Sequence, residues 1–301
     1  MQADWLIILV RFALYLDLML MFGLPLFALY ALREGERDVG KFRCYAGYAA
    51  MAGIVGLVLS VVDMAVVTKS MAGVEAYADL GRDVVAMTVT ETAFGIACIV
   101  RMSALLAGLI AGFALAHRPT ARYVALAATG GIALSSLAWA GHGAMNDGLA
   151  GVAHLSIDIA HLLAAGAWIG AFAGFLLLAR MTSPALLGRA ADGFAHIGTV
   201  IVVTLLLTGS ANYWFIAGMP TIESLTSSYG RILLVKLALF CAMLGLAALN
   251  RYRLAPALSM ALEGDSATAV QALRRSFIIE ASIGVAVLAT VAILGVQSPE
   301  P

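Results

Sequence analysis

Three of the five histidines in this chain, His142, His154 and His161, lie in one short segment with an aspartate and a methionine. His154, Asp158 and His161 are spaced i, i+4 and i+7, so on a single helix their side chains share one face. Met145 follows His142 in the stretch that leads into this helix. Imidazole is a good ligand for copper, zinc and nickel, and a thioether selects Cu(I) among the common metals. The five side chains therefore predict a metal site, in which histidine with aspartate suits Cu(II) and histidine with methionine suits Cu(I).

The composition places these residues in a membrane. The 301 residues are 62% hydrophobic and 12% charged, with a mean hydropathy of +0.96, whereas soluble globular proteins are about 45–50% apolar. Stretches of about 20 apolar residues, long enough to cross the hydrocarbon core as a helix, occur at residues 5–32, 44–68, 88–116, 121–141, 154–179, 195–217, 231–250 and 276–296. The first stretch has no small-residue cleavage site after it and is expected to be retained. We therefore expect an all-α, polytopic membrane protein with eight transmembrane helices.

Lysine and arginine are distributed unequally between the two sides of the membrane. Most of them fall in alternate loops, at residues 33–43, 118–122, 180–189 and 251–275. The other loops hold only Lys69, Arg82 and Arg231. Loops rich in lysine and arginine stay in the cytoplasm. Both termini and the segment around His142 are therefore expected on the outer side.

Polar side chains inside the spans are further candidates for function. A charge at the bilayer centre costs at least about 2.5–3.5 kcal/mol on insertion scales, so each one needs a partner or water. Besides Asp158 and His161 they are Arg11, Asp17, Asp63, Glu91, Arg101, His196, Asn212, Lys236 and Glu280. Only His196 and Glu280 fall in the inner half, which indicates a polar cavity that opens outward.

These charges suggest particular ion pairs. Arg11 is expected to pair with Asp158. The carboxylates of Asp63 and Glu91 are the expected partners of the other buried bases, Arg101 or Lys236. The alternative is that each base extends along its helix to the nearer membrane interface.

The two halves of the chain resemble each other weakly. Arg101 follows Phe94-Gly95 at the same spacing at which Lys236 follows Tyr229-Gly230. When the first half of the chain is aligned with the second, Gly23 falls opposite Gly170 and Arg11 opposite Asp158. Asp63 falls opposite Asn212. We therefore predict one integral membrane domain, residues 1–301, built from two parallel four-helix units, 1–141 and 142–301. The alternative is a chance coincidence of such residues in apolar helices.

Several functions lack support in the sequence. Cys44, Cys98 and Cys241 stand singly, which argues against a paired-thiolate metal relay. There is no glycine-rich phosphate loop and no cytoplasmic segment long enough for a nucleotide domain, so any transport is expected to be passive or ion-coupled. His-Glu-x-x-His and nucleophile-elbow motifs are missing too. We expect neither an enzyme nor a protein that binds nucleotides or nucleic acid.

A series of motifs along the second half of the chain resembles a known family. They are Gly141-His142, His154…Asp158-Ile-Ala-His161…Trp168-Ile-Gly170, Gly209…Asn212-Tyr213, Tyr229-Gly230-Arg231-Ile-Leu-Leu-Val-Lys236 and Asn250-Arg251. In this order and spacing the sequence resembles the copper-resistance protein D (CopD) family of bacterial inner-membrane proteins. Arg11, Gly23 and Phe94-Gly95…Arg101 extend the likeness more loosely to the first half.

The resemblance implies an eight-helix protein of the bacterial inner membrane that works in copper homeostasis and resistance. In such a membrane, the distribution of lysine and arginine puts both termini in the periplasm. Such proteins are thought to move copper across the membrane, usually inward, and to work with a periplasmic copper-binding partner of the CopC type. His142, His154, Asp158 and His161 match the motif of the family. Some relatives carry a CopC-like domain at the N-terminus, and this chain begins at its first helix, so a separate partner is implied.

The leading hypothesis is a copper transporter. His142 and Met145 would accept copper, and His154, Asp158 and His161 would pass it along one helix. His196, His117, Met181 and Cys44 lie near the inner side, but each is more simply explained as structural. One alternative is a haem-binding membrane cytochrome, for which His161 and His196 are poorly matched in depth. Another is a sensor or scaffold that binds copper only at the outer face.

Overall fold

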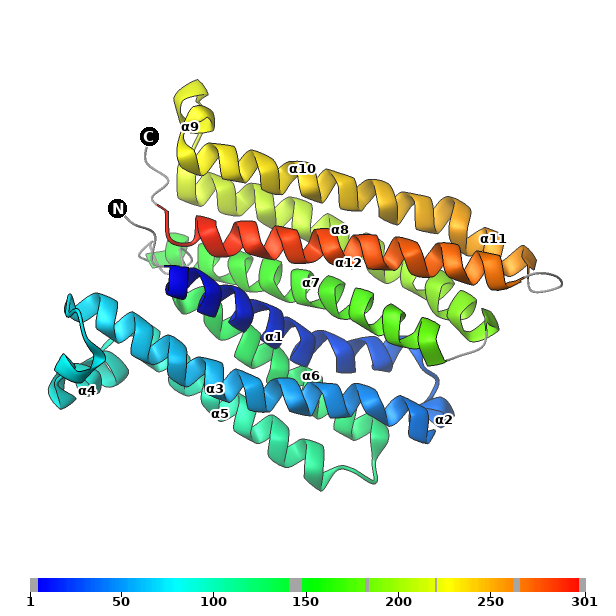
Figure 1. Cartoon of the computed structure of the whole chain (residues 1–301), viewed down its shortest axis with the longest axis horizontal. Coiled ribbons are helices and arrows are strands. Elements are labelled where there is room, and N and C mark those ends of the chain that lie inside the picture. The colour runs from blue at the N-terminus through cyan, green and yellow to red at the C-terminus, as the bar shows by residue number, and fades with distance from the viewer. Residues whose placement is uncertain (1–4, 141–147, 182–183, 220, 262–265, 298–301) are drawn as a thin grey trace.

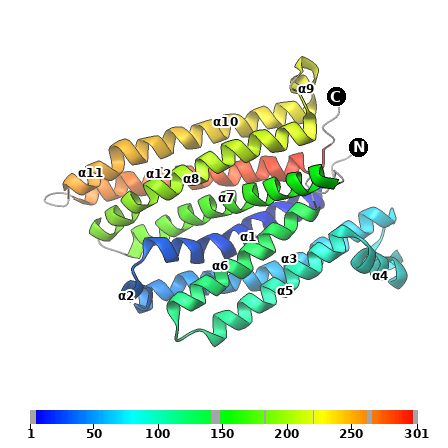
Figure 2. The same cartoon turned by 180° about the vertical axis from the view of Figure 1, so that it is seen from behind.

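The long helices run side by side along the molecule (Figure 1 and Figure 2). The computed structural model describes residues 5–140, 148–181, 184–219, 221–261 and 266–297. The long helices are α1 (Trp5–Ala31), α3 (Cys44–Ala72), α5 (Ala93–Ala114), α6 (Pro119–Ser135), α7 (Gly148–Met181), α8 (Pro184–Ala217), α10 (Ser228–Leu249) and α12 (Ser266–Leu294). Within the described residues these eight segments, some with a short adjoining turn, are long and apolar enough to cross a membrane, which confirms the predicted spans.

Short helices lie at both ends of the bundle. α4 (Arg82–Glu91) and α9 (Ile222–Thr226) lie where α1 begins and α12 ends, and we call this the terminal end (Figure 1). α2 (Glu34–Arg37) and α11 (Ala255–Met260) lie at the opposite end, called the basic end because the arginine-rich loops meet there. Shorter turns are the 3-10 helices η1 (Gly40–Arg43), η2 (Tyr77–Asp79) and η3 (Ser136–Ala140), and the π-helix η5 (Asn250–Leu254).

The two halves of the chain meet where α1 crosses α7. A Cβ atom at Gly170 would lie 2.2 Å from the Cα atom of Gly23. A Cβ atom at Gly23 would lie 2.4 Å from the carbonyl oxygen of Gly166. Only glycines allow this approach, since a methyl group would overlap the opposite backbone. Gly23 and Gly170 are residues that the sequence aligns between the halves, and equivalent residues beside a two-fold axis are expected to meet. The repeat as a whole stays a prediction.

A helix break separates Glu91 from the third span. Thr92 has an extended backbone (φ −106°, ψ 148°), and its side chain accepts a hydrogen bond of 2.9 Å from the backbone N–H of Gly95. This hydrogen bond caps the start of α5. Glu91 therefore ends α4, outside the span, and is exposed. The prediction of Glu91 as an intramembrane partner is wrong, because hydropathy does not register a capping residue.

The same local structure occurs at the start of α10. The side chain of Ser227 accepts a hydrogen bond of 3.0 Å from the backbone N–H of Gly230. A Cβ atom at Gly230 would lie 2.1 Å from the carbonyl oxygen of Ser224, just as one at Gly95 would lie 2.2 Å from that of Thr88. In both halves a short helix packs back onto the first turn of a span, which explains the glycine of the shared motif.

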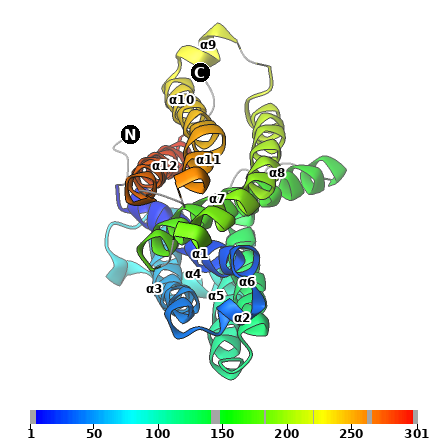
Figure 3. The same ribbon diagram turned by 90° about the vertical axis from the view of Figure 1, so that its right-hand side faces the viewer.

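The second half of the chain is packed more openly than the first. α8 lies against α7, and α10 lies against α12. Seen from the basic end, α8 and α10 diverge (Figure 3). Of the eight spans, α7 is the most buried, whereas α8 and α10 are the least. Two cavities lie among these four helices, one of them also lined by α1.

Candidate functional site

A cavity of about 210 Å³ lies among α1, α7, α8, α10 and α12 toward the terminal end, and we call it the terminal cavity. Its polar lining residues are Arg11, Tyr15, Asp158, His161, Asn212, Tyr213, Tyr229 and Lys236. These residues come from four different spans, α1, α7, α8 and α10. The fold therefore gathers five of the eleven polar groups that the sequence predicted inside the membrane: Arg11, Asp158, His161, Asn212 and Lys236.

Asp158 is held in this cavity by an amide from the neighbouring helix. The Nδ2 atom of Asn212 on α8 donates a hydrogen bond of 3.0 Å to Oδ1 of Asp158 on α7. The Oδ1 atom of Asn212 is buried and has no hydrogen-bond partner among the described residues. Sequence alignment of the halves singled out Asn212, and the structure places it directly on the predicted carboxylate.

The cations of the terminal cavity do not form a direct ion pair with Asp158 within the described residues. Arg11 instead donates a hydrogen bond of 2.7 Å from Nη1 to the carbonyl oxygen of Gly295, which ties α1 to the end of α12. The predicted Arg11–Asp158 pair is wrong in this respect, because the carbonyl at the frayed end of α12 is a closer acceptor. Lys236 also lines the cavity. One carboxylate therefore shares this space with two bases.

His161 has a defined hydrogen-bond partner. Its Nδ1 atom lies 2.9 Å from Oγ1 of Thr208 on α8. The Thr208 hydroxyl donates its proton to the carbonyl oxygen of Thr204 at 2.6 Å, so it can only accept from His161. The proton of the neutral imidazole is then on Nδ1, which leaves the Nε2 lone pair available to a metal ion.

Two methionines also line the terminal cavity. Met19 on α1 is 2% exposed and Met243 on α10 is 4% exposed. With His161 they supply two thioethers and one imidazole from three spans, a donor set that suits Cu(I). Sequence reasoning missed both residues, although a signal was present. Met19 follows Arg11 at i+8, and Met243 follows Lys236 at i+7, so each shares a helix face with a predicted intramembrane base.

The other predicted metal ligands are not seen at this cavity. His154 is 1% exposed and stacks on the ring of Phe215, with centroids 4.7 Å apart and planes 10° apart, away from the cavity lining. His142 and Met145 lie outside the described residues. Within the described part of the chain, no three histidine, cysteine, aspartate or glutamate residues lie close enough to hold a metal ion.

In the first half, the structure pairs Arg101 with Asp63. The Nη2 atom of Arg101 lies 2.9 Å from Oδ2 of Asp63, and its Nε atom donates a hydrogen bond of 3.0 Å to Oγ of Ser60. Arg101 is 1% exposed, so this base does not extend to an interface. The pair joins α5 to α3, and its two residues are those that the predicted repeat aligns with Lys236 and Asn212.

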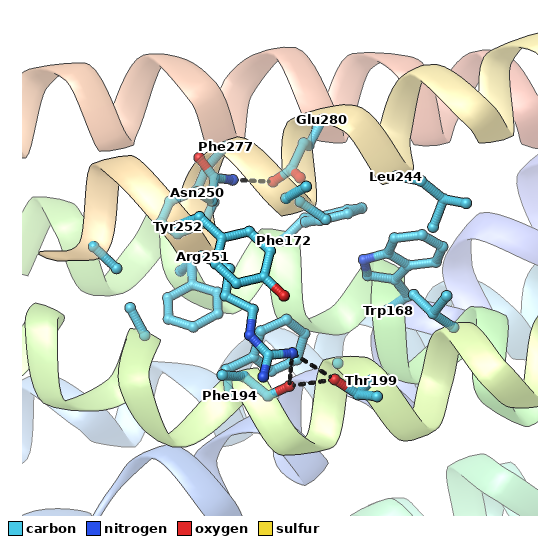
Figure 4. A pocket seen from close by; sticks show the side chains of 18 of the residues that line it. Trp168, Phe172, Phe194, Thr199, Leu244, Asn250, Arg251, Tyr252, Phe277 and Glu280 are labelled. Atoms are coloured by element: carbon cyan, nitrogen blue, oxygen red, sulfur yellow. Dashed lines mark hydrogen bonds between the residues drawn. The ribbon is translucent and has the colours of Figure 1, made fainter.

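A second cavity, of about 270 Å³, continues toward the basic end among α7, α8, α10, η5 and α12, and we call it the basic-end cavity (Figure 4). Trp168 lines both cavities and is 4% exposed. Its ring contacts Phe172 and Phe240, at centroid distances of 5.7 and 5.8 Å. The indole therefore lies at the border of two cavities that follow each other along α7.

Comparison with known proteins identifies the family. Residues 1–152 match the family model described as copper resistance protein D-like, N-terminal domain, and residues 188–294 match the one described as copper resistance protein D. Copper resistance protein D of Pseudomonas syringae pv. tomato is 40% identical over 304 residues, which cover 99% of this chain and 98% of that protein. Inner membrane protein YebZ of Escherichia coli (strain K12) is 31% identical over 123 residues, which cover 40% of this chain and 42% of that protein. No solved structure matches significantly. The motifs and the full-length similarity agree: this chain belongs to the copper resistance protein D family.

Proposed function

We propose that this chain transports copper inward across the bacterial inner membrane and that the ion passes through the terminal cavity. The observation that carries the proposal is the presence of His161, Met19 and Met243 in one buried cavity of a copper-resistance family member. Both termini would face the periplasm, because the arginine-rich loops lie at the opposite end.

Cu(I) is the proposed form of the ion. The three donors are neutral, and two of them are thioethers, which select Cu(I). The cavity also contains Arg11 and Lys236 against the single carboxylate of Asp158, so its fixed charge is positive when all three are ionised. A positive field repels a divalent ion twice as strongly as a monovalent one at the same distance. Charge and donor type therefore favour the same oxidation state.

Copper would enter through the segment that begins with His142 and Met145. His154 lies one turn before Asp158 on α7, nearer the terminal end, where it could receive the ion from that segment. A separate periplasmic copper-binding protein of the CopC type is the proposed donor. His142 and Met145 are the proposed copper ligands nearest the periplasm. The partner would therefore hand copper to them before the ion reaches His161.

Uptake of radioactive copper into proteoliposomes, with Cu(I) kept reduced, tests this function. We expect His161→Ala and the double variant Met19→Leu/Met243→Leu to lose most of the copper accumulation. Leucine conserves the volume of methionine, a swap that usually costs less than about 1.5 kcal/mol. The matched control is Met51→Leu, which removes a thioether that is 62% exposed on α3. Accumulation that persists in the double variant would contradict a path through the terminal cavity.

The same assay separates the alternatives. Copper that binds without accumulating in the liposomes would indicate a sensor or scaffold instead of a transporter. A haem cytochrome would need two histidines that face each other, whereas His161 lies in the terminal cavity and His196 is exposed and lines neither cavity. No observation in the described residues favours that reading.

A further inference from the structure

The basic-end cavity contains a buried carboxyl group that the proposed copper path does not use. Most of its wall is apolar and aromatic, including Trp168, Phe172 and Phe277. The charged or titratable groups that face it are Asp192 of α8, Arg251 and Tyr252 of η5, and Glu280 of α12. No such group comes from the α7 lining residues. Of these groups, Glu280 is the one that is buried, at 1% exposure.

Glu280 is only half satisfied. Asn250 donates a hydrogen bond of 2.8 Å from Nδ2 to Oε2 of Glu280 (Figure 4). The Oε1 atom of Glu280 and the Oδ1 atom of Asn250 are buried and lack hydrogen-bond partners among the described residues. Arg251 is turned away, because its Nη1 atom donates to Oγ1 of Thr199 at 2.8 Å and to the carbonyl of Ala195 at 3.4 Å. The carboxyl group therefore has an open oxygen and no direct counter-charge.

The two cavities share one design. In each, an asparagine from a neighbouring element donates its Nδ2 to a carboxylate and keeps a free Oδ1 atom. The terminal cavity adds bases, an imidazole and two thioethers to this pair. The basic-end cavity adds none of the soft donors, since no histidine, cysteine or methionine is among its lining residues. Copper therefore has ligands in the first cavity and lacks suitable ones in the second.

A proton is the cation that suits the second pair. An ionised carboxylate without a counter-charge is costly inside a membrane protein, and such a group becomes neutral by taking a proton. A neutral carboxyl group at Glu280 keeps the hydrogen bond with Asn250 and needs no further ligand. Sodium would need several more oxygen atoms around it than this pair supplies.

We propose that Glu280 is a proton-binding site that exchanges its proton with the basic end, and that this exchange couples copper movement to the pH difference across the membrane. The coupling part of the proposal rests on the proposed copper transport. Glu280 and Gly284 lie one turn apart on α12, with Glu280 in the basic-end cavity and Gly284 in the terminal cavity. A Cβ atom at Gly284 would lie 2.9 Å from Cδ1 of Ile169, the residue next to Trp168. A shift of α12 when Glu280 takes up a proton would thus move Ile169 and its neighbour Trp168, which lies between the two cavities.

The first test measures copper accumulation in proteoliposomes with and without a pH difference of one unit. If one proton moves per copper ion, a tenfold difference in proton activity changes the copper ratio by up to about tenfold, which is about 1.4 kcal/mol. Glu280→Gln is expected to accumulate copper and to lose this response. Glu280→Asp keeps a carboxyl group and is expected to keep the response to the pH difference. This variant shows whether the loss in Glu280→Gln comes from the missing carboxyl group or from any substitution at this position. Asp192→Asn is the matched control, because it removes an exposed carboxylate from the same cavity.

The second test is independent of transport. Infrared difference spectra near neutral pH should contain the carbonyl band of a neutral carboxylic acid that Glu280→Gln removes and Asp192→Asn retains. A response to pH in Glu280→Gln, or copper accumulation in the native chain without any response, would overturn the coupling and leave the copper transporter intact. If neither the native chain nor any variant accumulated copper, both the proposed copper transport and its coupling to protons would be contradicted. In that case the infrared band alone tests the proton site: a band that Glu280→Gln removes supports it, and a band that Glu280→Gln leaves unchanged, or no band at all, contradicts it.

Discussion

At the scale of single residues, the state of His161 depends on a hydroxyl group on another helix. The hydroxyl of Thr208 donates its hydrogen bond to the carbonyl oxygen of Thr204 and therefore accepts one from Nδ1 of His161, which fixes the imidazole proton on Nδ1. Polar groups that orient a histidine ligand in this way typically change metal affinity by about 10–100-fold when they are removed. This hydrogen bond between α7 and α8 thus decides whether Nε2 is presented to the cavity.

We expect Thr208→Val to weaken Cu(I) binding by about 10-fold or more, because valine keeps the shape of threonine but cannot accept from Nδ1. Thr208→Ser is expected to restore binding, since it keeps the hydroxyl. Competition with a chromophoric Cu(I) chelator measures both variants. Equal affinity of the valine variant and the native chain would mean that His161 is not a ligand or that its orientation is set elsewhere.

The candidate site was predictable to the extent that its residues are rare in apolar helices. Asp158, His161 and Lys236 stand out in a membrane span because each is costly there. Met19 and Met243 do not stand out, because methionine in an apolar helix is ordinarily a packing residue. The helix face that each shares with Arg11 or Lys236 is a weak signal, and the shared cavity that distinguishes them clearly depends on how the helices pack.

At the scale of elements, the crossing of α1 and α7 is the tightest contact between the two halves of the chain. The backbones touch at Gly23 and Gly170, so the distance between the helices is set by the absence of side chains. This contact fixes Met19, four residues before Gly23, relative to His161 on α7. The distance between α1 and α7 therefore determines how far Met19 lies from His161.

Gly170→Ala is expected to lower the melting temperature in detergent, because its methyl group would lie 2.2 Å from the Cα atom of Gly23 and force the helices apart. Overpacking of this kind typically costs about 1–3 kcal/mol. Gly47→Ala on α3 is the control, since no atom lies within 4 Å of the added methyl. There the alanine should be neutral or stabilising by up to about 1 kcal/mol, owing to its better helix propensity. Equal destabilisation by both substitutions would argue against the close crossing.

The spans themselves were predictable because about 20 apolar residues in a row have few alternatives to a membrane helix. Their ends were not, because capping is a local hydrogen-bond effect. Thr92 stops one helix and starts the next within a stretch that hydropathy reads as continuous. Glu91 was misplaced for that reason. The pairing of Glu280 with Asn250 was also beyond sequence reasoning, since it depends on η5 turning toward α12.

At the scale of the whole molecule, a polar contact joins the two halves at the basic end. Arg189 of α8 donates from Nη2 to both carboxylate oxygens of Glu36 in α2, at 2.6 and 2.7 Å. Burial alone would raise the pKa of Glu36, but the hydrogen bond from Arg189, the backbone N–H of Arg33 and the two positive charges together lower the pKa below its usual value of 4.5. The contact therefore stabilises the folded chain above pH 4.5, and this stabilisation is lost as the pH falls through the lower folded-state value.

Glu36→Gln is therefore expected to reduce stability above about pH 5 and to flatten its fall in acid. Partly exposed pairs such as this one typically contribute about 0.2–1 kcal/mol. The melting temperature measured between pH 7 and pH 3 in detergent tests this, with the exposed neighbour Glu34→Gln as control. If both variants followed the same pH dependence as the native chain, Glu36 would contribute nothing to the junction of the halves.

The position of Trp168 between the two cavities also has an electrical consequence. Water entering the cavities from opposite ends would carry the potential of each side deep into the protein. The voltage across the membrane would then fall mainly over the width of one indole and its aromatic neighbours, and not over the full bilayer thickness. A monovalent ion that steps past Trp168 would gain or lose nearly the whole membrane potential in a single move, about 2.3 kcal/mol per 100 mV.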